Sequence, residues 1–280
     1  MIHFQTGLLI TLFLVATQYA SNGNAYEIPF NQTYYQIWGG NHLTISDEGK
    51  EVQLLIDQYS GAGFSSKQNF GSGDFRIKLK LPKKNSKGVI TTFYLISKEV
   101  NEPARPKHDE VDFEFFGGDG KYTLNTNIFA NDEGHREQQF NLWFDPTADF
   151  HTYGILWNQY QIVLFVDDIP IRVFKNNTNL GVNYPSNKMH IEATMWNATA
   201  WIGEVDWSQG PFTAYFREFS INGCQYQKSN PQYCYRNSYY WNRINYWKLS
   251  PKQQQLYEDV REKHMTYDYC LRNAKDFPEC

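Results

Sequence analysis

A short segment in the middle of the chain constrains the fold more than any other. Residues 108–117 read His-Asp-Glu-Val-Asp-Phe-Glu-Phe-Phe-Gly, so polar and apolar side chains alternate. Successive side chains of a strand point to opposite faces, and the segment therefore predicts a strand that is buried on one face. The buried face would carry Val111, Phe113 and Phe115. The other face would carry His108, Glu110, Asp112 and Glu114.

The polar face of this strand places three carboxylates in one row, with neighbours about 6–7 Å apart. Like charges at this spacing repel one another, so folding alone does not explain them. A solvated outer face is the ordinary alternative, but such a face more often includes Lys, Thr or Ser. Close carboxylates raise each other's pKa, so one can act as an acid while a neighbour stays ionised. Glycoside hydrolysis requires such a pair.

In glycoside hydrolysis, each of the three acids would have its own role. Glu110 would attack the anomeric carbon, Glu114 would protonate the leaving oxygen, and Asp112 would hydrogen-bond to the nucleophile and tune it. Spacing alone does not fix the stereochemistry. Cα atoms four residues apart on a strand lie about 13 Å apart, whereas the carboxyls of a retaining pair lie ~5–5.5 Å apart. A calcium site is an alternative, although one strand offers few convergent oxygens; we expect no metal and no cofactor.

Composition narrows the possible partners. The 280-residue chain has 26 Lys and Arg against 30 Asp and Glu, a net charge of −4, and no basic block, which disfavours nucleic-acid binding. A mean hydropathy of −0.61 excludes a protein with many membrane spans. Aromatic residues make up 17% of the chain, and flat rings with polar edges suit stacking on sugars.

Period-two patterns dominate the rest of the chain. Residues 75–81 alternate, and residues 161–166 and 171–174 predict two strands around a turn at 167–170. A helix is predicted only late, where Ser250 and Pro251 offer an N-cap and a first-turn proline, and it should run through His264. Many short strands separated by turn signals favour a β-sandwich.

The N-terminus has the features of a secretory signal. Residues 8–16 form an apolar run that is too short to span a bilayer, and small residues allow cleavage after Ala25. The absence of Lys and Arg from residues 1–7 weakens the match, and a buried terminal strand or helix is the alternative. Secretion would permit N-glycosylation at three sequons, which begin at Asn31, Asn176 and Asn197.

All four cysteines lie late in the chain. Three pairings are possible, and we favour Cys224 with Cys234 and Cys270 with Cys280, because each pair closes a short loop. A zinc site is the alternative, but no CxxC spacing supports it. This clustering predicts a main domain that ends at 222 and a disulfide-stapled extension at 223–280; with the signal peptide at 1–25, the main domain covers 26–222.

The 108–115 segment resembles the active-site strand of plant xyloglucan endotransglucosylase/hydrolases, members of glycoside hydrolase family 16. The likeness covers nearly all of the mature chain and includes residues 59–66, 92–95, 141–147, 151–158, 167–172 and 267–270. It implies an all-β fold, a concave β-jelly-roll sandwich with an open cleft, and a C-terminal extension with a short helix. It also implies retaining chemistry through a glycosyl-enzyme, with polysaccharide donors and oligo- or polysaccharide acceptors, in the cell wall.

The resemblance further implies which residues line the cleft. It places Trp196 and Trp201 on the donor side, Tyr94 in the cleft, and Asn127 and Glu137 facing the sugar. His108 would hydrogen-bond near the nucleophile. Core packing or ordinary sheet scaffolding is the alternative for each of these residues.

Several positions depart from the family pattern. Asn125 and Gln139 stand where the family usually has Gln and Arg, and residues 117–120 replace the usual sequon after the catalytic strand. The connection from Tyr94 to Glu110 is long, and the 201–207 loop is short. Relatives that mainly hydrolyse tend to have that loop extended, so its shortness favours transfer.

We therefore expect a secreted, monomeric plant cell-wall endotransglucosylase that binds neither nucleic acid nor membrane. Xyloglucan is the default donor, and mixed-linkage or cellulosic glucan is an alternative. A non-catalytic β-glucan-binding protein on the same sandwich is the alternative of another class. We also expect four aromatic residues of the extension to lengthen the acceptor side of the cleft: Tyr239, Tyr240, Trp241 and Trp247.

Overall fold

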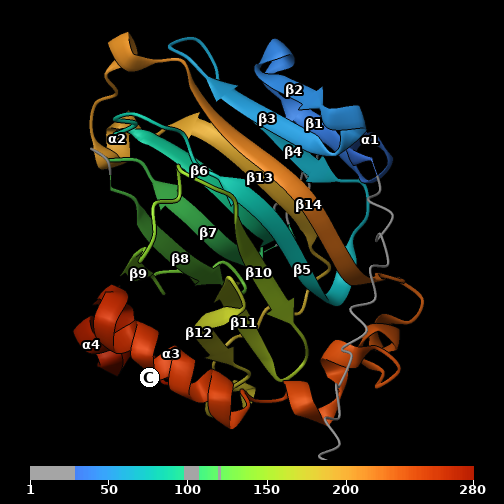
Figure 1. The fold of residues 1–280 in the computed structure, drawn as a ribbon. Helices are drawn as coiled ribbons and strands as arrows, with labels where there is room; N and C mark the ends of the chain where they lie inside the picture. The colour runs from blue at the N-terminus through green and yellow to red at the C-terminus, as the bar shows by residue number, and fades with distance from the viewer. Residues whose placement is uncertain (1–28, 98–106, 119–120) are drawn as a thin grey trace, which may run out of the picture.

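The protein is a sandwich of two antiparallel sheets (Figure 1). The computed structural model describes residues 29–97, 107–118 and 121–280; the predicted signal peptide lies outside them. One sheet has eight strands in the order β1-β4-β13-β6-β7-β8-β9-β15, and the other has seven in the order β12-β11-β10-β5-β14-β3-β2. This architecture confirms the predicted all-β jelly-roll class.

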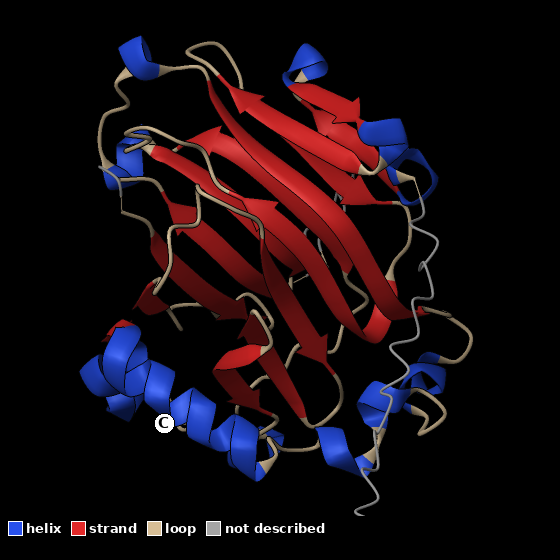
Figure 2. Cartoon of the chain, viewed as in Figure 1, coloured by secondary structure: helices blue, strands red, loops and turns tan. Residues whose placement is uncertain are grey.

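The eight-stranded sheet consists of β1 (Tyr34–Trp38), β4 (Ala62–Ser66), β13 (His190–Asn197), β6 (Val89–Ile96), β7 (Glu110–Phe116), β8 (Thr123–Phe129), β9 (Gln138–Asn141) and β15 (Met265–Asp268). The seven-stranded sheet consists of β12 (Ile169–Lys175), β11 (Gln161–Val166), β10 (His151–Trp157), β5 (Phe70–Lys80), β14 (Phe212–Gln225), β3 (Glu51–Ile56) and β2 (Leu43–Ser46). The α-helices are α1 (Phe30–Thr33), α2 (Thr199–Ile202), α3 (Pro251–His264) and α4 (Tyr269–Asn273). Figure 2 shows that they lie at the periphery of the two sheets.

The main hydrophobic core lies between the two sheets. Val111, Phe113 and Phe115 are fully buried there, as the alternation in β7 predicts. The ring of Tyr153 on β10 packs edge-on against Phe115, with centroids 4.7 Å apart, so aromatic contacts join the two sheets. Burial of one face of β7 fixes which residues the other face presents.

The predicted hairpin at 161–174 forms with a tighter turn than expected. Its strands are β11 and β12, and only Asp167 and Asp168 form the turn, with φ angles of 48° and 64°. Two left-handed residues suit a two-residue hairpin turn, which aspartate tolerates better than most residues. Ile169 and Pro170 therefore belong to β12 and not to the turn.

The helix and the disulfides of the extension form as the sequence predicts. Ser250 caps α3 in a capping box with Gln253, and the helix ends at His264. Disulfides join Cys224 to Cys234 and Cys270 to Cys280, which confirms the favoured pairing. The predicted boundary between 222 and 223 falls inside β14, which continues to Gln225.

The four aromatic residues expected on the acceptor side lie elsewhere, so that prediction was wrong. Trp241 is buried against Leu156, Val163 and Phe165, and Tyr239 and Tyr240 pack around the same cluster. Trp247 stacks on Tyr160, with ring centroids 4.1 Å apart. The reason is that β11 is buried on both faces, so its outer face needs an apolar cover that the extension provides.

Among the described residues, no helix is both long and apolar enough to cross a membrane.

Candidate active site

The three predicted carboxylates lie on the outer face of β7. Asp112 pairs with Tyr94 of β6 and Asn127 of β8, and Glu114 pairs with Thr92 and Asn125 on the same two strands. Residues directly opposite on neighbouring strands point to the same side of a sheet. The structure therefore brings Tyr94, Asn125 and Asn127 beside the acids, as the sequence predicts.

Glu114 is a half-buried carboxyl with an amide partner. Its carboxylate Oε2 accepts a hydrogen bond of 2.6 Å from Asn125 Nδ2. Burial raises the pKa of Glu114 to about 7; the Asn125 bond opposes this shift, and the charges of Glu110 and Glu137 add to it. A carboxyl with this pKa still holds its proton in mildly acidic solution and can donate it to a leaving oxygen.

Asp112 is more deeply buried than Glu110 and Glu114, with 4% of its surface exposed. Burial first, and then the charges of Glu110 and Glu114, raise the pKa of Asp112 well above its ordinary value. A hydrogen bond with Glu110 acts in the same direction, whereas the charge of Arg172 lowers it. Asp112 is thus suited to hold a proton between the two glutamates.

Glu110 has a basic neighbour. His108 Nε2 lies 3.5 Å from Glu110 Oε2, and 22% of the Glu110 side chain is exposed. His108 Nδ1 contacts Asp132, which lies in the turn after β8. The pKa of His108 is raised mainly by its hydrogen bond to Glu110, against the effect of burial, and Asp132 raises it further.

Two residues that sequence reasoning missed extend this network onto β13. Tyr94 donates a hydrogen bond of 2.6 Å to Glu192 Oε2, and His190 Nε2 lies 2.8 Å from Glu192 Oε1. Burial, followed by the charge of Glu192, raises the pKa of Tyr94 well above its ordinary value, so its hydroxyl remains a donor. The signal was available, because His190, Glu192 and Thr194 alternate with apolar residues.

Asn127 and Glu137 form a second polar pair. Asn127 Nδ2 donates to Glu137 Oε1 over 3.4 Å, while Asn127 Oδ1 accepts from the backbone N–H groups of Ile128 and Arg136. Asn127 is therefore oriented by backbone contacts, and Glu137 remains half-exposed. Gln139 lies beyond Asn125 in the row that contains Glu114.

The two predicted tryptophans lie together at the other end of β13. Trp196 is half-buried, whereas Trp201 on α2 is 55% exposed. Their rings stack with centroids 6.5 Å apart, and Trp201 also forms a T-shaped pair with Phe116 on β7. An exposed indole fixed from two sides presents a flat apolar face to solvent.

The acid that directly precedes Glu110 has a structural role. Asp109 is buried, and its carboxylate accepts hydrogen bonds from the backbone N–H groups of Asn131, Ser186 and Asn187 and from the Asn187 side chain. It ties the loop before β13 and the turn after β8 to the start of β7.

The extension reaches the site through β15. This strand pairs with β9, and Tyr267 lies opposite Gln139, in the row that contains Asn125 and Glu114. Tyr267 is half-buried, whereas the next residue, Asp268, is buried on the opposite side, where its carboxylate accepts from Gln138 Nε2 over 3.1 Å. Tyr267 thus adds an aromatic ring from the extension to this face.

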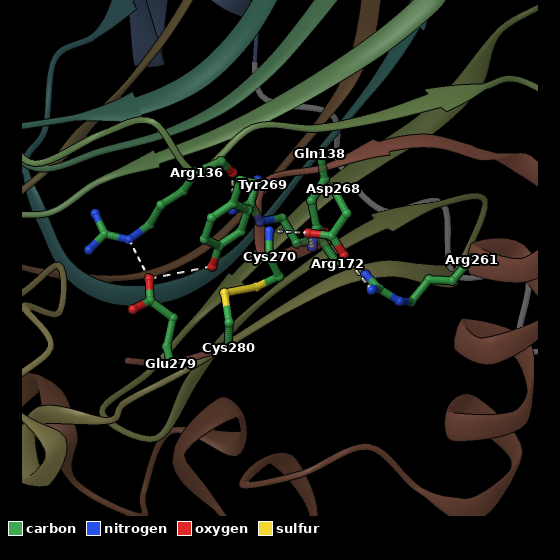
Figure 3. The surroundings of a disulfide bond; sticks show 9 residues. All are labelled: Arg136, Gln138, Arg172, Arg261, Asp268, Tyr269, Cys270, Glu279 and Cys280. Atoms are coloured by element: carbon green, nitrogen blue, oxygen red, sulfur yellow. Dashed lines mark hydrogen bonds and ion pairs between the residues drawn. A yellow bond between two sulfur atoms is a disulfide. The ribbon is translucent and has the colours of Figure 1, made fainter. Parts of the chain in front are cut away.

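Polar contacts around the Cys270–Cys280 disulfide anchor β15 (Figure 3). Arg136 Nε donates 2.6 Å to Glu279 Oε1, and both side chains are buried. Arg261 donates to the second oxygen of Asp268 over 2.6 Å. Because Arg136 also donates its backbone N–H to Asn127, the anchor is continuous with the site.

Sequence comparison decides the family. The profile of glycosyl hydrolases family 16 matches residues 30–210, and the profile of the xyloglucan endo-transglycosylase (XET) C-terminus matches residues 235–280. Xyloglucan endotransglucosylase/hydrolase protein 3 of Arabidopsis thaliana is 45% identical, over 95% of this chain and 93% of that protein. Protein 2 of the same plant is 47% identical, over 94% of this chain and 91% of that protein. The chain belongs to the xyloglucan endotransglucosylase/hydrolase family.

Solved structures agree with this family at the level of the fold. The Bacillus licheniformis β-glucanase superposes with a TM-score of 0.57 at 22% identity, over 69% of this chain and 92% of that one. The Crh5 transglycosylase superposes with a TM-score of 0.58 at 21% identity, over 69% of this chain and 79% of that one. In this chain, α3 and β15 lie in residues 235–280, which match the second profile and lie outside the match to the first.

Proposed function

We propose that this protein is a retaining endotransglucosylase that cleaves a β-1,4-glucan backbone, xyloglucan by default, and transfers the fragment to another glucan chain. The observation that carries the proposal is the unequal environment of the outer glutamates in one row. Glu114 has a pKa of about 7, whereas Glu110 has an imidazole beside it. Pairs of carboxyls whose environments differ in this way can divide acid and nucleophile roles.

In the first step, a Glu110 oxygen forms a bond to the anomeric carbon while the glycosidic bond breaks. Glu114 gives its proton to the leaving oxygen, and the product is a glycosyl ester on Glu110. In the second step, Glu114 accepts the proton of an acceptor hydroxyl, whose oxygen attacks the anomeric carbon and releases Glu110. Asp112 holds a proton that it donates in a hydrogen bond to Glu110, and in this way it tunes the nucleophile.

Transfer requires that a sugar hydroxyl replace water at the ester. Pre-positioning of a bound acceptor can supply effective molarities of roughly 10⁵–10⁸ M, which exceeds the concentration of water. Tyr267 on β15 supports an acceptor role for the extension, because it adds an aromatic ring to the row that contains Glu114. Trp196 and Trp201 support stacking of the donor on the other side.

The remaining features of the proposal concern the cellular setting. Secretion into the cell wall is supported by the apolar N-terminal run and the two disulfides, which persist in oxidising compartments. Asn31 and Asn197 are exposed and can accept glycans. The side-chain nitrogen of Asn176, to which a glycan would be attached, donates a hydrogen bond of 2.7 Å to the Gln159 carbonyl, so this sequon is the less suitable acceptor. We propose a monomer whose partners are the donor and acceptor polysaccharides.

A transfer assay tests the proposal. The secreted protein is incubated with polymeric xyloglucan and a labelled xyloglucan oligosaccharide, beside a Glu110→Ala variant. Label should enter polymer with the wild-type protein and not with the variant. If label never moves although the protein binds the glucan, the chain is a binding module, and the proposal fails.

A further inference from the structure

We infer that Asp132 is a positioning residue, which orients His108 and through it holds the nucleophile Glu110. The inference rests on the proposed function, since it concerns how that site selects its nucleophile. It assigns a role to a residue in the turn after β8, outside the catalytic strand.

The imidazole of His108 bridges two carboxylates. Its Nε2 faces Glu110 Oε2 at 3.5 Å, and its Nδ1 contacts Asp132 Oδ1. Glu110 Oε2 is therefore directed toward the imidazole. The charged groups around the ring are Glu110 on β7, Asp132 in the turn, and Lys107, whose charge acts on Asp132.

The position of His108 is fixed from several directions. Its backbone N–H donates to Asp132 Oδ1 over 2.9 Å, and the Asp132 N–H donates to the His108 carbonyl over 2.9 Å. Its ring stacks on Phe129, with centroids 5.2 Å apart. A ring held by its backbone, one face and one nitrogen has little rotational freedom, so the second nitrogen has a defined direction.

The turn itself adopts an uncommon conformation. Asn131 and Asp132 have φ angles of 58° and 69°, in the left-handed region that few non-glycine residues occupy. Asp109 accepts the Asn131 N–H and thereby ties this turn to the residue before Glu110. Such backbone conformations persist where surrounding contacts over-determine them, which is common at functional sites.

This arrangement distinguishes Glu110 from its neighbours. Among the described residues, Glu110 is the member of the row with a basic side chain within 4 Å. A protonated His108 places a positive charge beside Glu110, whereas Asp112 and Glu114 have raised pKa values and keep their protons more readily. This positive charge favours departure of Glu110 in the second step, when the ester bond breaks and the carboxylate regains its charge.

An Asp132→Asn variant tests the inference. Asn keeps a side-chain oxygen that can accept the backbone N–H of His108, and it tolerates the left-handed conformation. We expect kcat/KM for transfer to fall about tenfold, the effect of losing one charge-assisted hydrogen bond. KM should change little, and the alkaline limb of the pH profile should move to lower pH, because His108 loses its proton at lower pH once Asp132 no longer raises its pKa. An Asp47→Asn variant is the matched control, since Asp47 is exposed and also left-handed, with φ 50°.

A second readout does not depend on activity. NMR titration should show the His108 imidazole of Asp132→Asn titrating closer to the ordinary histidine pKa, about 6.5, than in the wild type. Asp132→Gly, which also suits the left-handed turn, should behave in the same way if the asparagine variant misfolds. Unchanged titration, or a loss of activity that is equal at all pH values, would overturn the inference. If the wild-type protein transfers no glucan, the proposed function fails, while the titration still decides the role of Asp132.

Discussion

At the scale of single residues, the carboxyls in and beside the site differ in their burial and in their hydrogen-bond partners. Asp109 is saturated with hydrogen bonds and tethers loops, although it adjoins Glu110 in sequence. Asp112 is buried beside two acids, and Glu114 has one amide donor. The chemistry therefore follows from the partners of each acid and not from its residue type.

The raised pKa of Glu114 makes a prediction about stability. A carboxyl whose pKa is higher in the folded than in the unfolded state stabilises the fold below the unfolded value and loses that contribution as pH rises through the folded value. For Glu114 this window runs from 4.5 to about 7. The unfolding free energy of Glu114→Gln minus that of the wild type should therefore be about 1–3 kcal/mol larger at pH 8 than at pH 4.

Urea unfolding at the two pH values measures this difference. The matched control is Glu258→Gln, on the exposed side of α3. If Glu114→Gln changes the unfolding free energy equally at pH 4 and pH 8, the pKa of Glu114 is not raised in the folded state.

At the scale of elements, two pieces of the extension have separate roles. The segment around Trp241 covers the outer face of β10 and β11, whereas β15 adds a strand to the sheet that carries the acids. The Cys270–Cys280 disulfide and the Arg136–Glu279 pair hold β15 in register with β9. The extension thus contributes to the site through a single short strand.

This division predicts different outcomes for two tyrosines. Tyr267→Ala should lower the ratio of transfer to hydrolysis by about two- to tenfold, because an aromatic contact is worth roughly 0.5–1.5 kcal/mol beyond the area it buries. Tyr239→Ala should leave the ratio unchanged, since Tyr239 packs on the other sheet. The ratio is measured as label incorporated into polymer against new reducing ends. Equal ratios for Tyr267→Ala and the wild type would show that β15 does not contribute to acceptor binding.

At the scale of the whole molecule, alternation predicted the fold well. The segment 108–117 gave both the buried and the polar face of β7, and short-loop closure gave both disulfides. The contacts between distant segments could not be predicted in this way. Asp132 reaches His108, and Tyr267 joins the row of Glu114, only because β7, β8, β9 and β15 are neighbours in the sheet. The tail aromatics were misplaced because composition does not show which sheet face lacks a cover.

The central claim is that Glu110 carries the glucan fragment covalently. A donor that bears fluorine at C2 slows release of the ester, so protein digestion and mass spectrometry can locate the attached sugar. We predict that the sugar is found on the peptide with residues 108–117, at Glu110, and is absent from Glu110→Gln. A sugar attached to another residue, or transfer by Glu110→Gln at the wild-type rate, would contradict this account.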